Sequence, residues 1–225
     1  MNDSILRTTL ITTANELNDS GINQGTAGNL SVRTDDGFLI TPSGMQYSVL
    51  EPEDIVFMNL SGEHSASRKP SSEWRFHRDI YAAREDAGAI VHTHSVHATA
   101  LACLDRNIPA FHYMVAAAGG RDIRCAPYAT YGTQELSDLA VAALAERKAC
   151  LLAHHGVIAL GRGPGSGPGS GLGDALALAA EVETLAHQYL AALAVAEPAL
   201  LPDAEMDIVI EKFKTYADNS QQSSK

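Results

Sequence analysis

Apolar side chains along the first sixty residues follow two different spacings. Residues 4–20 carry them near helical spacing, and Gly21 then ends the pattern, so this segment is predicted to form a helix. Strand-like runs separated by turn residues come next, at residues 29–33, 38–41 and 55–59. The short turns between these runs favour antiparallel pairing of the strands.

The rest of the chain alternates between helical and strand-like segments. Ser72 and Ser95 are good N-cap residues, and they open predicted helices at residues 72–84 and 95–104. Further helices are predicted at residues 136–148, 174–195 and 203–216, and buried strands at residues 89–93 and 149–153. Because strands and helices interleave without an internal repeat, we expect a layered α/β domain with a mixed sheet that contains antiparallel pairs.

Two segments lack the apolar positions that a core requires. Residues 161–173 form a Gly/Pro/Ser tract, for which we expect a flexible surface loop. Residues 218–225 form a polar tail, which we expect to be disordered. The tract matches neither GxxxxGK[ST] nor GxGxxG and is therefore not interpreted as a phosphate loop.

Composition narrows the class of protein. The 225 residues are 45% hydrophobic and 19% charged, as in a globular protein with one large core. No apolar run is long enough to span a membrane, and the first residues do not resemble a signal peptide. Three scattered cysteines without a CxxC motif predict reduced, mostly buried thiols and a cytoplasmic location.

The net charge of −11 argues against nucleic acid or an anionic membrane as a partner, because both require a basic surface. It also constrains how a phosphate group could be bound. We expect backbone N–H groups and hydroxyls to hold any phosphate locally, rather than a broad basic field.

Histidines at two strand ends are the strongest candidates for metal ligands. His92 and His94 lie two residues apart on a predicted strand, so both side chains point to the same face. A second apolar strand ends at His154 and His155, next to Gly156. Three imidazoles and one open position are typical of a catalytic zinc site. Only one of His154 and His155 can face the site, and the residues alone do not choose between them.

The other histidines are given lesser roles. His97 is interpreted as a packing or hydrogen-bonding residue, and His187 as a surface residue in the middle of a helix. His64 and His77 carry no signal above background.

Hydroxyl-rich turns supply the candidate phosphate site. Ser71, Ser72 and Glu73 lie at a loop-to-helix junction, where free N–H groups favour an anion, although such a start taken alone is far more often simple helix capping. Residues 25–29 and 41–44 add turns with small residues, hydroxyls and an amide. Together the three segments predict local phosphate binding.

Eight segments then form a joint pattern along the chain: residues 23–29, 70–77, 92–97, 108–114, 116–120, 125–130, 155–156 and 211–216. This pattern resembles the class II aldolases of the fuculose-1-phosphate aldolase family over about residues 5–216. The resemblance implies a three-layer α/β/α sandwich around a largely antiparallel sheet. We accordingly expect a single domain over residues 1–217.

The resemblance also assigns roles. It implies one zinc ion per subunit on His92, His94 and His155, with Glu73 as an additional ligand and the proton carrier. The implied substrate and phosphate site comprises Thr26, Gly28, Asn29, Ser43, Gly44, Ser71 and Ser72. Three further residues, Tyr113, Phe213 and Tyr216, would reach the pocket from a neighbouring subunit of a homotetramer, with Tyr113 and Tyr216 catalytic. Tyr131 stands where close relatives carry Phe and would lie near the aldehyde.

The implied reaction is reversible cleavage of a ketose 1-phosphate into dihydroxyacetone phosphate and an aldehyde. The candidate substrates are L-fuculose 1-phosphate, 5-deoxyribulose 1-phosphate and 5-methylthioribulose 1-phosphate. One alternative is a sugar-phosphate 4-epimerase of the same superfamily, which would carry Asp where this chain has Glu73. Another is a metal-free, adducin-like interaction module, which retention of the three histidines and Glu73 argues against.

Overall fold

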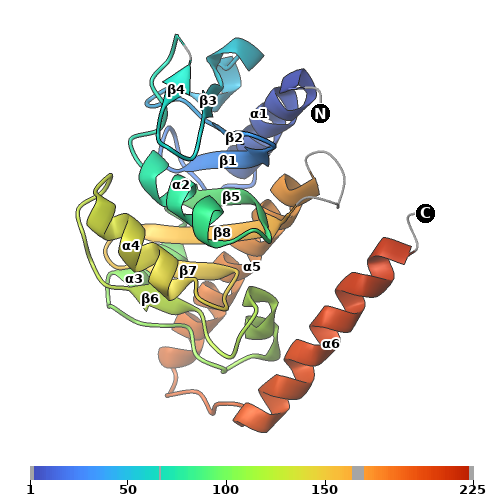
Figure 1. Ribbon diagram of the computed structural model, residues 1–225. Coiled ribbons are helices and arrows are strands. Elements are labelled where there is room, and N and C mark those ends of the chain that lie inside the picture. Colours follow the sequence, from blue (N-terminus) through green and yellow to red (C-terminus); the bar gives the residue numbers. More distant parts are fainter. Residues whose placement is uncertain (1–2, 66, 164–169, 223–225) are drawn as a thin grey trace.

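The chain folds around a single eight-stranded sheet with helices on both faces (Figure 1). The computed structural model describes residues 3–65, 67–163 and 170–222. Its helices are α1 (Asp3–Asp19), α2 (Trp74–Ala83), α3 (Val96–Ala102), α4 (Gln134–Ala143), α5 (Ser170–Leu193) and α6 (Asp203–Gln222). Its strands are β1 (Asn29–Thr34), β2 (Gly37–Ile40), β3 (Val56–Met58), β4 (His64–Ser65), β5 (Ala87–Thr93), β6 (Arg124–Ala126), β7 (Ala149–Leu152) and β8 (Gly156–Arg162). Short 3₁₀ helices lie at η1 (Tyr47–Val49), η2 (Pro52–Asp54) and η3 (Tyr113–Ala118).

The strands follow the order β4-β3-β2-β1-β5-β8-β7-β6. Neighbouring strands pair antiparallel, except for β6 and β7, which are parallel. The predicted mixed, largely antiparallel sheet is therefore confirmed. All seven residues of the central strand β5 are buried, because helices cover both faces of the sheet there.

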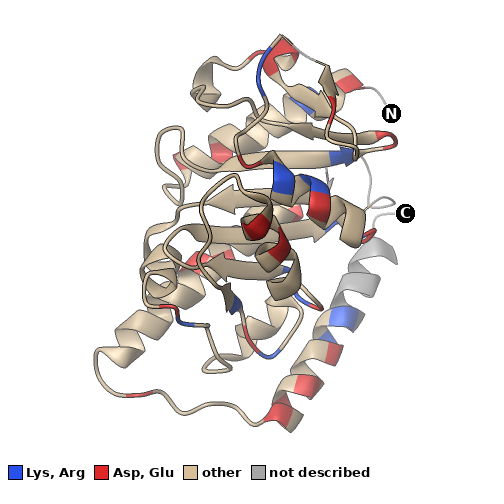
Figure 2. Ribbon diagram, turned by 60° about the vertical axis from the view of Figure 1, so that its left-hand side comes forward, with Lys and Arg blue, Asp and Glu red and all other residues tan. Residues whose placement is uncertain are grey.

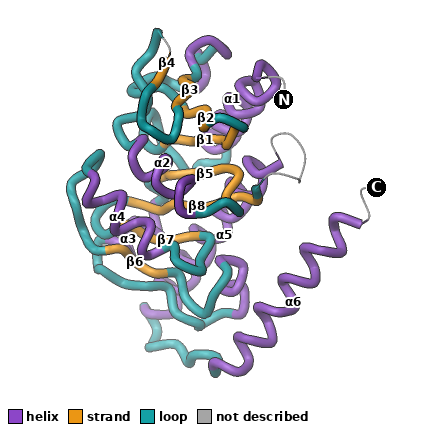
Figure 3. Tube along the Cα trace, viewed as in Figure 1, coloured by secondary structure: helices purple, strands orange, loops and turns teal. Residues whose placement is uncertain are grey.

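Helices form a layer on each side of the sheet (Figures 1 and 3). On one side α2 and α4 pack against each other and place Phe76, Ile80 and Leu136 in a common apolar cluster. On the other side α1, α3 and α5 pack together, and Leu10 of α1 shares a cluster with Leu172 of α5. This arrangement confirms the α/β/α sandwich.

The last helix, α6, leaves these layers and runs beside them (Figure 3). Its first turns contact η3, Met206 is fully buried there, and Arg121 pairs with Asp203 and Asp207. Because α6 continues to Gln222, the predicted disorder of residues 218–225 is wrong for residues 218–222; residues 223–225 lie outside the described chain. Neither Gly nor Pro interrupts residues 203–222, so no residue with a strong helix-breaking tendency ends the helix earlier.

The flexible loop predicted at residues 161–173 is also too long. Gly161 lies in β8, and α5 begins at Ser170, while residues 164–169 are outside the described chain. A Cβ on Gly161 would lie 1.7 Å from the carbonyl oxygen of Gly171. These glycines therefore allow β8 and α5 to approach closely. A high glycine content alone does not show whether a segment is closely packed or a flexible loop.

Further differences concern element ends. Helix α2 begins at Trp74, with Glu73 rather than Ser72 at the N-cap position. Strand β8 was not predicted, although its apolar residues 157–160 directly follow the short turn after β7. Strands β4 and β6 are only two and three residues long and were missed as well.

The distribution of basic residues, the hydropathy of the helices and the burial of the cysteines can be compared with the expectations from composition. Figure 2 shows the basic residues of the described chain spread over several elements. Among the described helices, none is both long and apolar enough to cross a membrane. Cys150 is buried, but Cys125 is half-buried and Cys103 is exposed, so the expectation of mostly buried thiols is wrong for Cys103.

Candidate metal and phosphate site

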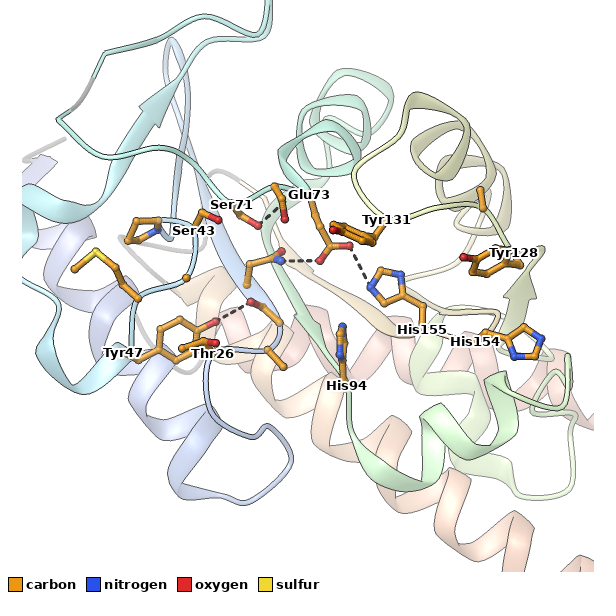
Figure 4. A pocket seen from close by; sticks show the side chains of 18 residues that line it. Thr26, Ser43, Tyr47, Ser71, Glu73, His94, Tyr128, Tyr131, His154 and His155 are labelled. Carbon is orange, nitrogen blue, oxygen red and sulfur yellow. Dashed lines mark hydrogen bonds and ion pairs between the residues drawn. The ribbon is translucent and has the colours of Figure 1, made fainter.

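Four side chains converge at one end of the central strands. Glu73, His92, His94 and His155 each offer a ligand atom, and these atoms all lie within 4.8 Å of one another. Nε2 of His92 lies 3.0 Å from Nε2 of His94 and 3.2 Å from Oε2 of Glu73, and Nε2 of His155 lies 3.1 Å from Oε1 of Glu73. Figure 4 shows Glu73, His94 and His155 pointing toward one another.

The end of β5 directs the first two histidines. His92 is the penultimate residue of the strand and fully buried, and His94 follows directly after its end. Between them Thr93 points the other way, and the single proton of its hydroxyl is shared between the carbonyl oxygen of Ile22 at 2.8 Å and Oδ1 of Asn23 at 2.9 Å. Thr93 thus anchors the preceding loop while the alternation of the strand sends both imidazoles to the same side.

The turn between β7 and β8 separates His154 from His155. His154 has a left-handed φ of 54°, its side chain is 51% exposed, and its ring lies against Tyr128. His155 instead turns inward to Glu73. The backbone conformation, which the residues alone did not reveal, therefore places His155 in the cluster.

The donor set fits a divalent metal such as zinc. Nδ1 of His92 lies 3.0 Å from the carbonyl oxygen of Val157, which can only accept, so the ring proton is on Nδ1 and Nε2 is free to bind a cation. Ligands at tetrahedral zinc are separated by about 3.3 Å when the bonds are about 2.0–2.1 Å, close to the separations in this cluster. In the described chain the buried Oε1 of Glu73 accepts no hydrogen bond, as expected of an oxygen that faces a cation.

The electrostatics of the cluster favour an ionised carboxylate at Glu73 and a neutral imidazole at His94. Burial raises the pKa of Glu73, but the neighbouring His92 and His155 outweigh burial and hold that pKa well below its usual range. Burial, followed by the nearby His92 and His155, lowers the pKa of His94 to about 4. Neutral imidazoles and an ionised carboxylate are the forms that bind metal.

A cavity of about 330 Å³ opens beside the cluster (Figure 4). Its walls include every residue predicted for the substrate and phosphate site on a single subunit: Thr26, Gly28, Asn29, Ser43, Gly44, Ser71, Ser72 and Tyr131. Gly28 has a φ of +74°, and a Cβ there would lie 2.4 Å from the carbonyl oxygen of His92. The turn that carries Gly28 therefore packs directly on the strand that carries the histidines.

Two predicted site residues, Tyr113 and Phe213, are not among the described residues that line this cavity. Tyr113, in η3, is 50% exposed and is not among the lining residues. Phe213 packs with the apolar cluster around η3 and α6. Tyr216 belongs to α6, but its side chain lies outside the described part of the chain.

His77 was missed by the sequence analysis. It is fully buried, and its Nε2 lies 2.5 Å from Oδ1 of Asn29, whose Nδ2 donates to Oε2 of Glu73 at 3.0 Å. The available signal was its spacing: Glu73 and His77 are four residues apart at the start of a predicted helix, which places them on one face.

The prediction for His97 holds, since Nδ1 lies 2.7 Å from a carboxylate oxygen of Glu183.

Comparison with known proteins decides the family. Residues 8–190 match the family described as Class II Aldolase and Adducin N-terminal domain. The chain belongs to this family. The 5-methylthioribulose-1-phosphate/5-deoxyribulose-1-phosphate aldolase of Rhodospirillum rubrum is 59% identical to it over 216 residues, which cover 96% of this chain and 94% of that protein. The L-fuculose phosphate aldolase of Escherichia coli is 52% identical over 208 residues, 92% of this chain and 93% of that protein.

A solved structure of an L-fuculose 1-phosphate aldolase superposes on this class II aldolase with a TM-score of 0.87. The two chains are 42% identical, and the match covers 93% of this chain and 96% of the other. The predicted family, fold and enzyme class are thereby confirmed: the protein is an aldolase, a carbon–carbon lyase. The epimerase alternative is not favoured by these relatives.

Proposed function

We propose that this aldolase holds one zinc ion per subunit on His92, His94, His155 and Glu73 and cleaves a ketose 1-phosphate into dihydroxyacetone phosphate and an aldehyde. The observation that carries the proposal is the position of the four ligand atoms, within 4.8 Å of one another, at the wall of a cavity lined by hydroxyls. A metal centre beside a cavity with hydroxyl-bearing walls suits a substrate that carries both a reactive oxygen pair and a phosphate.

When bound, zinc would supply a Lewis acid for the negative charge that develops on the three-carbon fragment. The residues of the chain handle the proton. Asn29 donates to Oε2 of Glu73, whereas Oε1 accepts no hydrogen bond from the described residues. Oε1 of Glu73, which lacks that donor, is thus the oxygen that would face the metal at rest and move a proton to or from the reacting carbon during turnover.

Phosphate binding would orient the substrate. The hydroxyls of Thr26, Ser43 and Ser72 line the cavity and can donate to phosphate oxygens without a lysine or arginine, in keeping with the net charge of −11. A phosphate that is held at a distance from the breaking bond would keep the reacting carbon close to Glu73.

We further propose a cytoplasmic homotetramer in which a neighbouring subunit completes the pocket with Tyr113, Phe213 and Tyr216. The half-exposed Tyr113 and the partly exposed Phe213 lie outside the cavity of their own subunit, which supports a role at another subunit's site. Mixing a His92→Ala variant with a Tyr113→Ala variant tests this sharing. Activity that returns on subunit exchange supports shared sites, and mixtures that stay inactive after exchange contradict them.

For the aldehyde half we propose 5-deoxyribulose 1-phosphate and 5-methylthioribulose 1-phosphate as the first substrates. The relative with 59% identity, named for those two sugars, supports this choice. L-fuculose 1-phosphate is the second candidate, supported by the relatives with 52% identity. Comparing kcat/KM for the three sugars decides between them, with dihydroxyacetone phosphate measured by its NADH-coupled reduction.

The metal is tested separately. Elemental analysis should find one zinc per subunit in the purified protein and in a His154→Ala variant, because His154 points away from the cluster. A His92→Ala variant should lose the zinc and the cleavage activity together. A C4 epimer formed without dihydroxyacetone phosphate, or full cleavage activity in the zinc-free protein, would contradict the proposed function.

A further inference from the structure

A line of hydrogen bonds runs from the buried Tyr81 to Glu73 at the wall of the cavity. The Tyr81 hydroxyl lies 2.8 Å from Oγ of Ser31, which lies 2.6 Å from Nδ1 of His77. Nε2 of His77 lies 2.5 Å from Oδ1 of Asn29, and Nδ2 of Asn29 lies 3.0 Å from Oε2 of Glu73. These five side chains are buried, and they join strand β1 to helix α2.

Each hydrogen bond in this line has only one direction. A carboxylate only accepts, so Asn29 must turn its N–H toward Glu73 and its oxygen toward His77. An amide oxygen also only accepts, so Nε2 of His77 carries the proton. Burial, and then the neighbouring His92, lower the pKa of His77 to about 3, which leaves the ring neutral and Nδ1 an acceptor.

The donors therefore point from the core toward Glu73. Ser31 must donate to Nδ1 of His77, and the Tyr81 hydroxyl must donate to Ser31. Burial raises the pKa of Tyr81, so its proton remains in place. The result is a fixed tautomer at His77 and a fixed amide orientation at Asn29.

Asn29 occupies a position where this orientation matters. It touches Glu73 on one side and lines the phosphate cavity on the other. Its side chain could in principle rotate toward a phosphate oxygen, because a phosphate accepts the same N–H. On the buried side, the contact of its oxygen with Nε2 of His77 opposes that rotation and keeps the N–H on Glu73.

We propose that His77 is a positioning residue, which holds the Asn29 amide with its N–H on Oε2 of Glu73 and so leaves Oε1 as the oxygen that carries the proton. This inference rests on the proposed aldolase function and on Glu73 as its proton carrier. It assigns a role to a residue that touches neither the cavity nor the predicted metal ligands directly.

Two substitutions at His77 separate positioning from packing. In His77→Gln the amide nitrogen replaces Nε2 and can still donate to Asn29, whereas in His77→Asn the shorter amide reaches only the position of Nδ1 beside Ser31. The readout is the exchange of the C3 hydrogen of dihydroxyacetone phosphate with deuterated water, followed by NMR. This half-reaction requires the proton step at Glu73 but no aldehyde.

We expect His77→Asn to lower the maximal exchange rate roughly 10–100-fold, as is typical when a residue that orients a ligating side chain is removed. KM for dihydroxyacetone phosphate should change far less, and zinc should stay at one per subunit. His77→Gln should recover most of the rate. Equal loss of rate in the two variants, or a loss that follows zinc content or thermal stability, would overturn the proposal.

Ser31→Ala provides a second test if His77→Asn fails to fold. It removes only a hydroxyl, but it frees His77 to place its proton on Nδ1 and turn an acceptor toward Asn29. We expect a smaller loss of exchange rate in the same direction, and an unchanged rate would overturn the proposal. Wild-type protein that binds zinc but catalyses no exchange would instead contradict Glu73 as the proton carrier, so the two failures are distinguishable.

Discussion

Gly156 offers a sharp test of how the fold positions the proposed metal ligands. It is the first residue of β8, next to His155, and it packs against the segment that carries His92 and His94. A Cβ at this position would lie 2.5 Å from the carbonyl oxygen of Thr93 and 3.0 Å from Cδ2 of His94. Gly156 does not have a left-handed φ, so the substitution Gly156→Ala introduces no backbone strain of that kind. It perturbs the site through the steric contacts of the new Cβ with Thr93 and His94.

The size of the displacement follows from these distances. Ordinary contacts begin at 3.4 Å, so the carbonyl of Thr93 must retreat by 3.4 − 2.5 = 0.9 Å, or the turn must move by the same amount. A shift of about 1 Å in catalytic groups costs on the order of 100-fold in rate. Overpacking of this kind also costs about 1–3 kcal/mol in the free energy of unfolding. We therefore expect kcat/KM of Gly156→Ala to fall on the order of 100-fold.

The assay combines kcat/KM, zinc content and urea unfolding. Gly173→Ala is the matched control, because Gly173 lies in α5 and a Cβ there would meet no atom within 4 Å. Alanine in a helix is favoured over glycine by about 0.5–1 kcal/mol, so this variant should be slightly more stable and retain one zinc per subunit. Wild-type kcat/KM and zinc binding in Gly156→Ala would refute the idea that backbone contact positions the ligands.

Three further predictions concern the metal, pH and specificity. A chelator should abolish activity and lower the melting temperature, and added zinc should restore both. Burial raises the pKa of Glu183, but its hydrogen bonds from the backbone N–H groups of His97 and Ala98 outweigh burial and lower it. Glu183→Gln should therefore cost about 1–3 kcal/mol in urea unfolding at pH 7, and the deficit should shrink as pH falls below the ordinary value of 4.5 through the lowered folded pKa. A deficit that grows in acid would contradict this assignment. Tyr131→Phe should lower kcat/KM for L-fuculose 1-phosphate by about 2–10-fold more than for 5-deoxyribulose 1-phosphate. The reason is that only L-fuculose 1-phosphate has a hydroxyl on C5 to which the Tyr131 hydroxyl can bind. Equal effects on the two sugars would exclude that hydrogen bond.

Local spacing predicted the parts of the site that depend on local structure. The two-residue spacing of His92 and His94 fixes a common side of any strand, whatever that strand pairs with. Likewise, the hydroxyls at residues 71 and 72 lie just before a helix whose apolar spacing is clear from the sequence. These features required no knowledge of neighbouring elements.

The parts that were missed depend on contacts between distant segments. His77 acquires its role only because β1 brings Asn29 and Ser31 next to α2, 48 and 46 residues away in the chain. The choice between His154 and His155 depends on the left-handed φ of His154, which cannot be inferred from two neighbouring residues of the same type. In the sequence, Gly161 and Gly171 belong to a Gly/Pro/Ser tract that is typical of a flexible loop. In the structure, they instead permit β8 and α5 to pack closely against each other.

The register of the three central strands joins these local features into one site. Asn29 pairs with His92 across β1 and β5, and His92 pairs with Ile158 across β5 and β8. The amide of Asn29, the imidazole of His92 and the strand that follows His155 thus lie on one row of the sheet. A shift of either pairing by one residue would turn His92 or Asn29 to the opposite face and separate Glu73 from its hydrogen-bond donor. Substitutions that loosen the edge strands β4 or β6 should therefore change stability more than catalysis, whereas those that disturb β1, β5 or β8 should change both.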